Sequence, residues 1–326
     1  MNHPNRITIA TDVKFNDPLP EAVDVVIIGG GVIGVFTALN LAEAGKRVLL
    51  CEKGRVAGEQ SSRNWGWIRQ QGRDEDELPI AMQSVQLWKD IDKKLNGKCG
   101  VKETGVAYLT STHSEVAEFA EWVEIARRNG LHSEMMTPSQ INDCFSGKSN
   151  EQWIGGVRTP SDCKGEPWQA VPAVAEYAQS LGVQIIENCA VRRLETQAGQ
   201  VSGVVTEHGK VACEQVVLAG GAWSRLFLGA HDVDIPQLSV LATAAQTAPL
   251  PDFAKANCVD EELALRRRVD GGYTLALADR QVLHLGRDAF ASLKPWLPVA
   301  RKNWRHTSFA LASPKGFPDA WGTSRN

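Results

Sequence analysis

The pattern of apolar and polar residues near the start of the chain predicts a strand, a helix and a second strand in succession. Residues 23–28 are almost continuously apolar, which is typical of a buried parallel strand. Residues 32–44 place apolar side chains at helical spacing, and they are followed by Gly45, a residue type that often comes directly after a helix. A further apolar run at residues 47–52 completes a βαβ unit.

Glycines occupy the turn of this unit in the pattern Gly29-x-Gly31-x-x-Gly34. Gly29 permits a tight turn, Gly31 allows a pyrophosphate to approach the backbone, and Gly34 lets the helix pack closely on the strand. The helix N-terminus adds free N–H groups and a positive dipole end. Glu52 ends the second strand, where a carboxylate can accept hydrogen bonds from both hydroxyls of an adenosine ribose. The unit therefore predicts dinucleotide binding rather than an ordinary glycine-rich turn.

A loop of unusual composition follows at residues 58–73. It is rich in glycine, hydroxyl and amide side chains, contains two tryptophans, and leads into a helical pattern at residues 78–95. One interpretation is a surface loop with an exposed apolar patch. A long loop directly after a nucleotide-binding strand more often carries function, so we favour a role in the site.

The rest of the chain alternates helical and strand patterns. We interpret residues 101–156 as inserted material of a second domain, and Thr137-Pro138 as the start of a short helix. Periodicity is weak past residue 290. The other expected helices are 114–129 and 167–181, and the expected strands are 105–110, 183–187, 190–196, 201–206, 211–218, 264–269 and 273–277.

Composition and charge narrow the class of protein. The chain has 326 residues, 43% of them hydrophobic and 22% charged, which is typical of a globular protein. A formal net charge of −3 argues against a general nucleic-acid binder, because such affinity comes from clustered Lys and Arg. The basic runs at residues 266–268 and 294–305 are expected to be solvated faces.

The cysteines and the N-terminal residues bear on location and metal binding. The seven cysteines show no CxxC or zinc spacing, so we expect no metal site and reduced thiols in a cytoplasm. Residues 1–20 lack the features of a signal peptide, and no apolar run is long enough to span a membrane. We expect a cytoplasmic protein, with peripheral docking at the inner face of the membrane as the alternative.

Taken in order over about residues 22–290, these segments resemble the FAD-dependent oxidoreductases of the D-amino-acid oxidase and dehydrogenase superfamily, which includes glycine oxidase and sarcosine oxidase. Besides the glycine turn, the resemblance rests on the loop Ser61-Ser-Arg-Asn-Trp-Gly66 and on the late strand that ends in Gly220-Gly221-Ala-Trp-Ser224. The same fingerprint also suits NAD(P), but these two segments favour FAD.

The resemblance implies an α/β fold. A Rossmann-like FAD-binding domain of the GR2 flavoprotein type is expected beside a second α+β substrate domain built on a mostly antiparallel sheet. We expect the FAD-binding domain at residues 21–100 and 157–235, the substrate domain at 101–156 and 236–326, and an N-terminal extension at 1–20.

The resemblance also assigns cofactor contacts along the whole length of FAD. The expected FAD-binding residues are Gly29, Gly31, Val32, Ile33 and Gly34 at the pyrophosphate, Glu52 and Lys53 at the adenosine ribose, Val191 at the adenine, Ser61, Ser62, Asn64, Trp65 and Gly66 on the flavin side, and Gly220, Gly221 and Trp223 near the ribityl and phosphate portion.

Substrate contacts are expected from arginines, because a planar guanidinium can bond both oxygens of a carboxylate. In sarcosine oxidase-like members an arginine soon after the flavin loop binds substrate, and Arg69 has the similar position here. Arg266 and Arg268 share one face of an expected strand and are further candidates. Tyr273 is a candidate pocket wall, although a strand tyrosine is more often core. His284, between apolar neighbours, is expected to be a satisfied strand histidine.

The implied activity is the oxidation of an amino acid, either a D-amino acid or an N-substituted (secondary) amine. Hydride transfer from the carbon of the C–N bond to flavin N5 would give an imine that water hydrolyses to an oxo acid, and oxygen or a respiratory chain would accept the electrons. Two alternatives stay open. One is an FAD-dependent dehydrogenase of a 2-hydroxy acid or polyol phosphate, and the other is a truncated or split, non-catalytic FAD-binding chain.

The C-terminal part departs from the family pattern. Family members usually supply a further glycine-rich loop there, and this sequence shows no strand-to-helix glycine loop after Gly221. The chain also ends well before the resembling enzymes do. We therefore expect an incomplete substrate domain, with FAD held loosely unless a second subunit supplies the missing segment.

Overall fold

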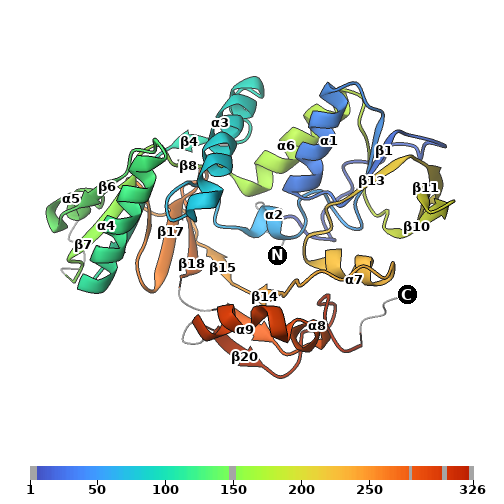
Figure 1. The fold of residues 1–326 in the computed structure, drawn as a ribbon. Helices are drawn as coiled ribbons and strands as arrows, with labels where there is room; N and C mark the ends of the chain where they lie inside the picture. Colours follow the sequence, from blue (N-terminus) through green and yellow to red (C-terminus); the bar gives the residue numbers. More distant parts are fainter. Residues whose placement is uncertain (1–5, 147–151, 279–280, 303–306, 323–326) are drawn as a thin grey trace. The chain divides into compact units, whose positions relative to one another are not determined.

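The computed structural model describes residues 6–146, 152–278, 281–302 and 307–322 (Figure 1). The chain forms two compact units. Unit 1 comprises Met1–Arg63, Val171–Ala242 and Arg280–Asn326, and unit 2 comprises Asn64–Ala170 and Thr243–Asp279.

A parallel sheet forms the centre of unit 1, with strand order β13-β1-β2-β9. Every residue of β1 and β2 is buried, because a parallel sheet is covered on both faces. Between them runs α1, which packs on both strands and confirms the predicted βαβ unit. The bounds are β1 (Val25–Ile28), α1 (Val32–Glu43), β2 (Val48–Cys51), α2 (Gln60–Arg63), α6 (Pro167–Ser180), β9 (Gln184–Ile186) and β13 (Gln215–Leu218).

An antiparallel sheet of β10 (Val191–Gln197), β11 (Gln200–Thr206) and β12 (Gly209–Ala212) also belongs to unit 1. It shares a hydrophobic core with the parallel sheet, in which Val204 and Val211 pack with Leu49. The predicted strand 211–218 is two strands in the structure. The chain leaves the antiparallel sheet after β12 and enters the parallel sheet as β13, so one apolar run serves two sheets.

The last part of unit 1 contains a strand-to-helix glycine turn that the sequence did not predict. β19 leads through Leu285 and Gly286 into α8, with Gly286 at the N-cap. The expectation that no such turn follows Gly221 was therefore wrong, because α8 has only 5 residues and is too short to show a helical period. The elements here are α7 (Ser224–Gly229), β14 (Val240–Leu241), β19 (Gln281–His284), α8 (Arg287–Ala291), α9 (Leu293–Lys302) and β20 (Thr307–Ala310).

A seven-stranded, mostly antiparallel sheet is the centre of unit 2, with order β15-β18-β17-β16-β5-β7-β6. Its one parallel pair among these strands, β16 with β5, joins the two chain segments of the unit. Helices α4 and α5 both pack on β7 (Figure 1). The bounds are β5 (Val106–Thr110), α4 (His113–Arg128), β6 (Glu134–Met136), α5 (Pro138–Asp143), β7 (Gly155–Thr159), β15 (Ala244–Gln246), β16 (Asn257–Val259), β17 (Leu263–Arg267) and β18 (Tyr273–Leu277).

A small sheet of β3 (Trp67–Ile68), β8 (Cys163–Lys164) and β4 (Lys102–Glu103) and helix α3 (Leu78–Lys94) complete unit 2. The expected hairpin is present, since β17 pairs antiparallel with β18. These features confirm the predicted fold class, a Rossmann-like α/β domain with a second domain on a mostly antiparallel sheet. Among the described helices, none combines the length and apolar character needed to cross a bilayer.

Candidate functional site

The glycine turn of unit 1 has no room for side chains. Gly29 has a φ of +113°, and a Cβ there would lie 2.5 Å from the carbonyl oxygen of Ala219. A Cβ on Gly34 would overlap the carbonyl oxygen of Gly29. Backbone is therefore exposed at the turn and α1 approaches β1 closely, as a pyrophosphate cradle requires.

The first turn of α1 is bordered by a serine hydroxyl. Gly31 is the N-cap residue and provides no side-chain cap. Instead, the Val32 N–H donates to Ser61 Oγ at 2.9 Å. The adjacent Ser62 is 5% exposed, and its Oγ has no hydrogen-bond partner within the described residues. The free N–H groups and the positive dipole end of α1 suit an anionic ligand.

Glu52 is fixed at the end of β2 by backbone N–H groups. Its Oε2 accepts from Gly30 at 2.7 Å and its Oε1 from Gly54 at 2.7 Å. Burial raises the pKa of this carboxyl, while the two N–H donors oppose that rise. Each oxygen keeps a second lone pair, so the carboxylate can still accept hydrogen bonds from ribose hydroxyls.

The end of β13 lies against the same turn. The Ala219 N–H donates to the Ile28 carbonyl at 2.8 Å, which places Gly220 next to the glycine turn. The Lys53 Nζ lies 3.6 Å from the centroid of the Trp223 ring. Unit 1 thus brings together the predicted residues Gly29, Gly31, Val32, Ile33, Gly34, Glu52, Lys53, Ser61, Ser62, Gly220, Gly221 and Trp223.

Val191, the predicted adenine contact, begins β10. Its side chain is buried in the core of unit 1, packed with Cys51 and Cys189. The backbone two residues earlier reaches the site, because the Cys189 N–H donates to the Glu52 carbonyl at 2.9 Å. Any contact of Val191 with adenine would therefore come from its backbone.

The predicted flavin-side residues of unit 2 form a turn fastened to Arg266. The Gly66 N–H donates to Asn64 Oδ1 at 2.7 Å, and Arg266 Nε donates to the Trp65 carbonyl at 2.6 Å. Gly66 has a φ of +75°, and a Cβ there would lie 2.6 Å from Arg266 Nε. The Trp65 ring packs edge-to-face on Trp67, with centroids 5.2 Å apart.

Arg266 and Arg268 are both engaged inside unit 2, so the expectation that they belong to a solvated basic face was wrong. Arg266 is 0% exposed and its Nη1 lies 3.0 Å from Glu166 Oε1. Arg268 donates from Nη2 to Asp270 Oδ2 at 2.9 Å and to the Thr247 carbonyl at 2.8 Å. The expected shared face of the strand is confirmed, since both side chains are buried, although β17 itself ends at Arg267.

Arg69 has a different environment. It is half-buried, its Nη1 donates to the Gln71 carbonyl, and its guanidinium carbon lies 5.9 Å from the Tyr108 ring centroid. Within the described residues, no ion pair to a carboxylate is formed by Arg69. Of the three candidate arginines, it therefore keeps the most donor capacity for a ligand.

Tyr273 matches the structural interpretation given for it, whereas His284 is satisfied at only one of its two ring nitrogens. Tyr273 is 0% exposed, and its hydroxyl bonds the Phe253 N–H at 3.0 Å, so it is a core residue of unit 2. His284 Nδ1 lies 2.8 Å from the Ala312 carbonyl, while its Nε2 has no partner in the described part of the chain.

Sequence reasoning missed three polar residues near the arginines. Glu166 pairs with Arg266, and Asp162 accepts from the backbone N–H of Gln70 at 2.7 Å. Gln71 is 0% exposed, and neither polar atom of its amide has a partner among the described residues. The amide-rich composition of residues 58–73 was the available signal for Gln71, whereas nothing in the sequence singled out the two acids.

Comparison with known proteins finds one matching family model and relatives that are oxidases or deaminases of amino acids and amines. The family model described as FAD dependent oxidoreductase (DAO) matches residues 24–310. L-Amino acid deaminase from Proteus myxofaciens has a similar structure, with a TM-score of 0.87 and 29% identity, covering 93% of this chain and 69% of that one.

Two relatives are longer than this chain. The 4-methylaminobutanoate oxidase (formaldehyde-forming) of Paenarthrobacter nicotinovorans is 25% identical over 310 residues, which are 92% of this chain and 37% of the relative. Sarcosine oxidase subunit beta of an Arthrobacter species is 29% identical over 228 residues, which are 68% of this chain and 56% of the relative. The chain thus spans less than two thirds of either relative. Because the family model matches residues 24–310, the chain belongs to the FAD dependent oxidoreductase family, and the cofactor of this family is FAD.

Proposed function

We propose that this chain oxidises the amine of an amino acid, primary or N-methylated, to an imine. Water hydrolyses the imine to an oxo acid and ammonia or an amine where the α-carbon loses the hydride, and to formaldehyde and the demethylated amino acid where an N-methyl carbon loses it. The names of the relatives support this proposal. One is an L-amino acid deaminase, one a sarcosine oxidase subunit and one a 4-methylaminobutanoate oxidase. The substrates in these names all carry both an amine and a carboxylate.

Such a reaction makes limited demands on the protein. FAD, when bound, accepts the hydride from the carbon that carries the nitrogen. The protein must hold the cofactor, hold the substrate carboxylate and exclude competing groups, and it needs no nucleophile or paired acid and base. The glycine turn, Ser61 beside it and Glu52 would hold the pyrophosphate and ribose of FAD.

The observation that carries the proposal is the spare donor capacity of Arg69. A carboxylate binds best to a planar guanidinium that is not already neutralised. Arg266 and Arg268 are paired with Glu166 and Asp270 at 3.0 and 2.9 Å, whereas Arg69 donates to a backbone carbonyl. We therefore assign the substrate carboxylate to Arg69.

The test is anaerobic reduction of the flavin by a panel of compounds, measured as the loss of visible flavin absorbance. The FAD-loaded chain is mixed with L- and D-amino acids, N-methyl amino acids, 2-hydroxy acids and polyol phosphates. Reduction by amines alone supports the proposal. Reduction by hydroxy acids or polyol phosphates alone would instead support the dehydrogenase alternative, and a chain that binds FAD but is reduced by none of the compounds would support the non-catalytic one.

Arg69→Lys tests the assigned residue, with Arg73→Lys as its control in the same loop. Arg73 is exposed and lies 3.6 Å from Glu77. A charge-assisted bidentate contact contributes about 1.5–3 kcal/mol, so Arg69→Lys should raise KM by about tenfold to a hundredfold. Equal KM values for the two variants would remove Arg69 from the substrate site.

The same proposal includes oxygen or a respiratory chain as the electron acceptor and a second subunit as a partner. One relative is a subunit of a larger enzyme, which supports a second subunit for this chain also. Oxygen consumption distinguishes an oxidase from a dehydrogenase, which would reduce only an added artificial acceptor.

A further inference from the structure

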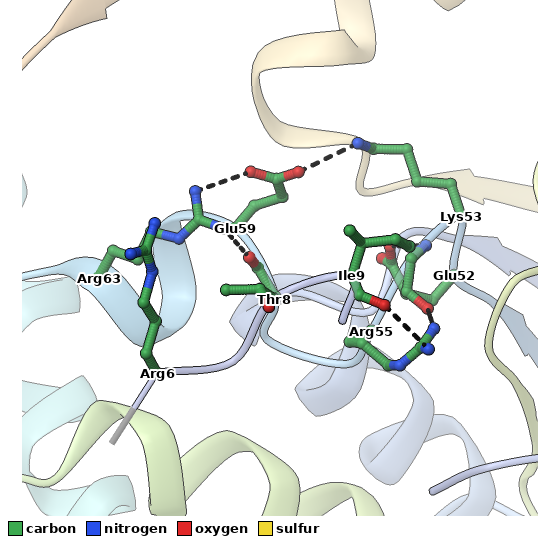
Figure 2. A pocket seen from close by; sticks show the side chains of 10 residues that line it. Arg6, Thr8, Ile9, Glu52, Lys53, Arg55, Glu59 and Arg63 are labelled. Atoms are coloured by element: carbon green, nitrogen blue, oxygen red, sulfur yellow. Dashed lines mark hydrogen bonds and ion pairs between the residues drawn. The ribbon is translucent and has the colours of Figure 1, made fainter. Parts of the chain in front are cut away.

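The N-terminal residues 6–12 run past the end of β2 and form one side of a cavity in unit 1. The cavity has a volume of about 370 Å³, within the range of small-molecule sites. Figure 2 shows its lining side chains. They are Arg6, Thr8, Ile9, Glu52, Lys53, Arg55, Glu59 and Arg63, with Gly54 and Gly58 completing the lining.

Arg55 fastens this segment to the loop after β2. Its Nε donates to the Thr11 carbonyl at 2.6 Å and its Nη2 to the Ile9 carbonyl at 3.1 Å. Its Nη1 donates to Asn188 Oδ1 at 2.5 Å and to the Gly54 carbonyl at 3.0 Å. Since Arg55 is only 9% exposed, these bonds are shielded from water and hold the segment in one position.

The segment is also ordered by itself and by the residues that follow it. The Thr11 N–H donates to the Thr8 carbonyl at 2.9 Å, which closes a turn. Further along, the Lys14 N–H donates to Glu187 Oε2 at 2.8 Å, and Phe15 is buried at 1% exposure. The wall of the cavity is therefore a built part of unit 1.

The chemistry of the lining suits an adenosine. Glu52 offers carboxylate oxygens that can accept from ribose hydroxyls. Ile9 is 68% exposed, although it is a large apolar residue, and its Cδ1 lies 3.6 Å from the position of a Cβ on Gly54. An exposed isoleucine beside a ribose-binding carboxylate provides an apolar surface for a flat aromatic base.

Charges on the other side of the cavity are mostly positive, because Arg6, Lys53 and Arg63 line it together with one carboxylate, Glu59 (Figure 2). Glu59 lies between Lys53, at 3.2 Å, and Arg63, at 3.4 Å (Figure 2). Glu59 offsets part of this charge, and the remaining positive charge suits an adenosine that carries phosphate, as that of FAD does.

We propose that residues 6–12 are part of the adenosine-binding site of FAD, with Ile9 in contact with the adenine ring and Arg55 as the positioning residue that holds the segment. This inference rests on FAD as the cofactor. It extends the site to a stretch that the sequence showed only as an N-terminal extension.

The test compares Ile9→Ser with Val13→Ser, which changes an apolar residue next to the segment that does not line the cavity and is 44% exposed. Dissociation constants for FAD and ADP are measured by calorimetry. Ile9→Ser should weaken both ligands about tenfold, because an apolar contact with the ring is lost, and Val13→Ser should leave both within about twofold.

Hydrogen exchange provides a second readout that does not depend on activity. ADP should slow amide exchange in residues 6–12 of the wild-type chain. If the wild-type chain binds FAD but the two variants bind it equally, or the segment gains no protection, the inference is wrong while the cofactor assignment stands. A wild-type chain that binds neither FAD nor ADP would contradict both.

Discussion

The buried ion pair of unit 2 allows a quantitative prediction. Arg266 and Glu166 are 0% and 1% exposed and lie 3.0 Å apart. At an effective dielectric constant of about 20, charges at this separation attract by about 5 kcal/mol. Glu166 Oε1 also accepts from the Val269 N–H at 2.9 Å, so this carboxylate supports two elements at once.

Glu166→Gln keeps the shape of the side chain and an acceptor for Val269 but removes the charge. The guanidinium of Arg266 is then buried without a counter-charge, which should cost about 3–5 kcal/mol of unfolding free energy. Arg266→Met should cost a similar amount, because it leaves the carboxylate uncompensated. The double variant should lose far less than the sum of the two, since no unpaired charge remains.

The free energy of unfolding is measured for the wild type, the two single variants and the double variant by urea titration, with tryptophan fluorescence as the signal. Trp168 is a suitable reporter, because its ring centroid lies 5.8 Å from the Arg266 guanidinium carbon. We expect a coupling energy of about 3 kcal/mol from the double-mutant cycle. If the single costs simply add, the pair does not determine the stability of unit 2, and the argument that Arg266 is committed to Glu166 and unavailable to substrate fails with it.

Three further predictions concern unit 1 and the thiols. Gly34→Ala should destabilise the chain by about 1–3 kcal/mol, because the added Cβ meets the Gly29 carbonyl. The control is Gly229→Ala, at a helical glycine where an added Cβ would have no atom within 4 Å. It should be neutral or slightly stabilising in the same urea assay. Burial raises the pKa of Glu52 above its usual 4.5, so the affinity for ADP should fall as the pH drops through that raised pKa and the carboxylate takes up a proton. Glu52→Gln should bind ADP weakly and with little pH dependence. A wild-type affinity for ADP that does not change from pH 8 to pH 5 would count against this role. All seven cysteines are free and buried, so a thiol reagent should label none of them in the native chain and all of them in urea, and prompt labelling of any one in the native chain would contradict the structure.

The nucleotide end of the site could be predicted from sequence because local physics determines it. A buried strand, a crowded glycine turn and an acid after the second strand all follow from short stretches of chain, and the structure places Gly29, Gly34 and Glu52 as expected. Even the helix bounds agree closely, since α1 lies between the glycine turn and Gly45, both of which are visible in the sequence.

The substrate side could not be predicted to the same depth, because its arrangement depends on contacts between distant segments. Arg266 meets Glu166 across a hundred residues of chain, and no local pattern shows that its charge is already paired. The unpaired amide of Gln71 is likewise visible only in three dimensions. The short helix α8 was missed for a different reason, since 5 residues carry too little periodicity to recognise.

The strand order of unit 1 has a consequence for how the chain folds during synthesis. β1 is the first strand made, yet it lies in the interior of its sheet, between β2 and β13. Its edge facing β13 stays unpaired until residues 215–218 have left the ribosome, and through that interval the most apolar segment of the nucleotide site is open to wrong partners. Folding of the parallel sheet must therefore wait for its late strand, and slow folding with a need for chaperones is the expected behaviour.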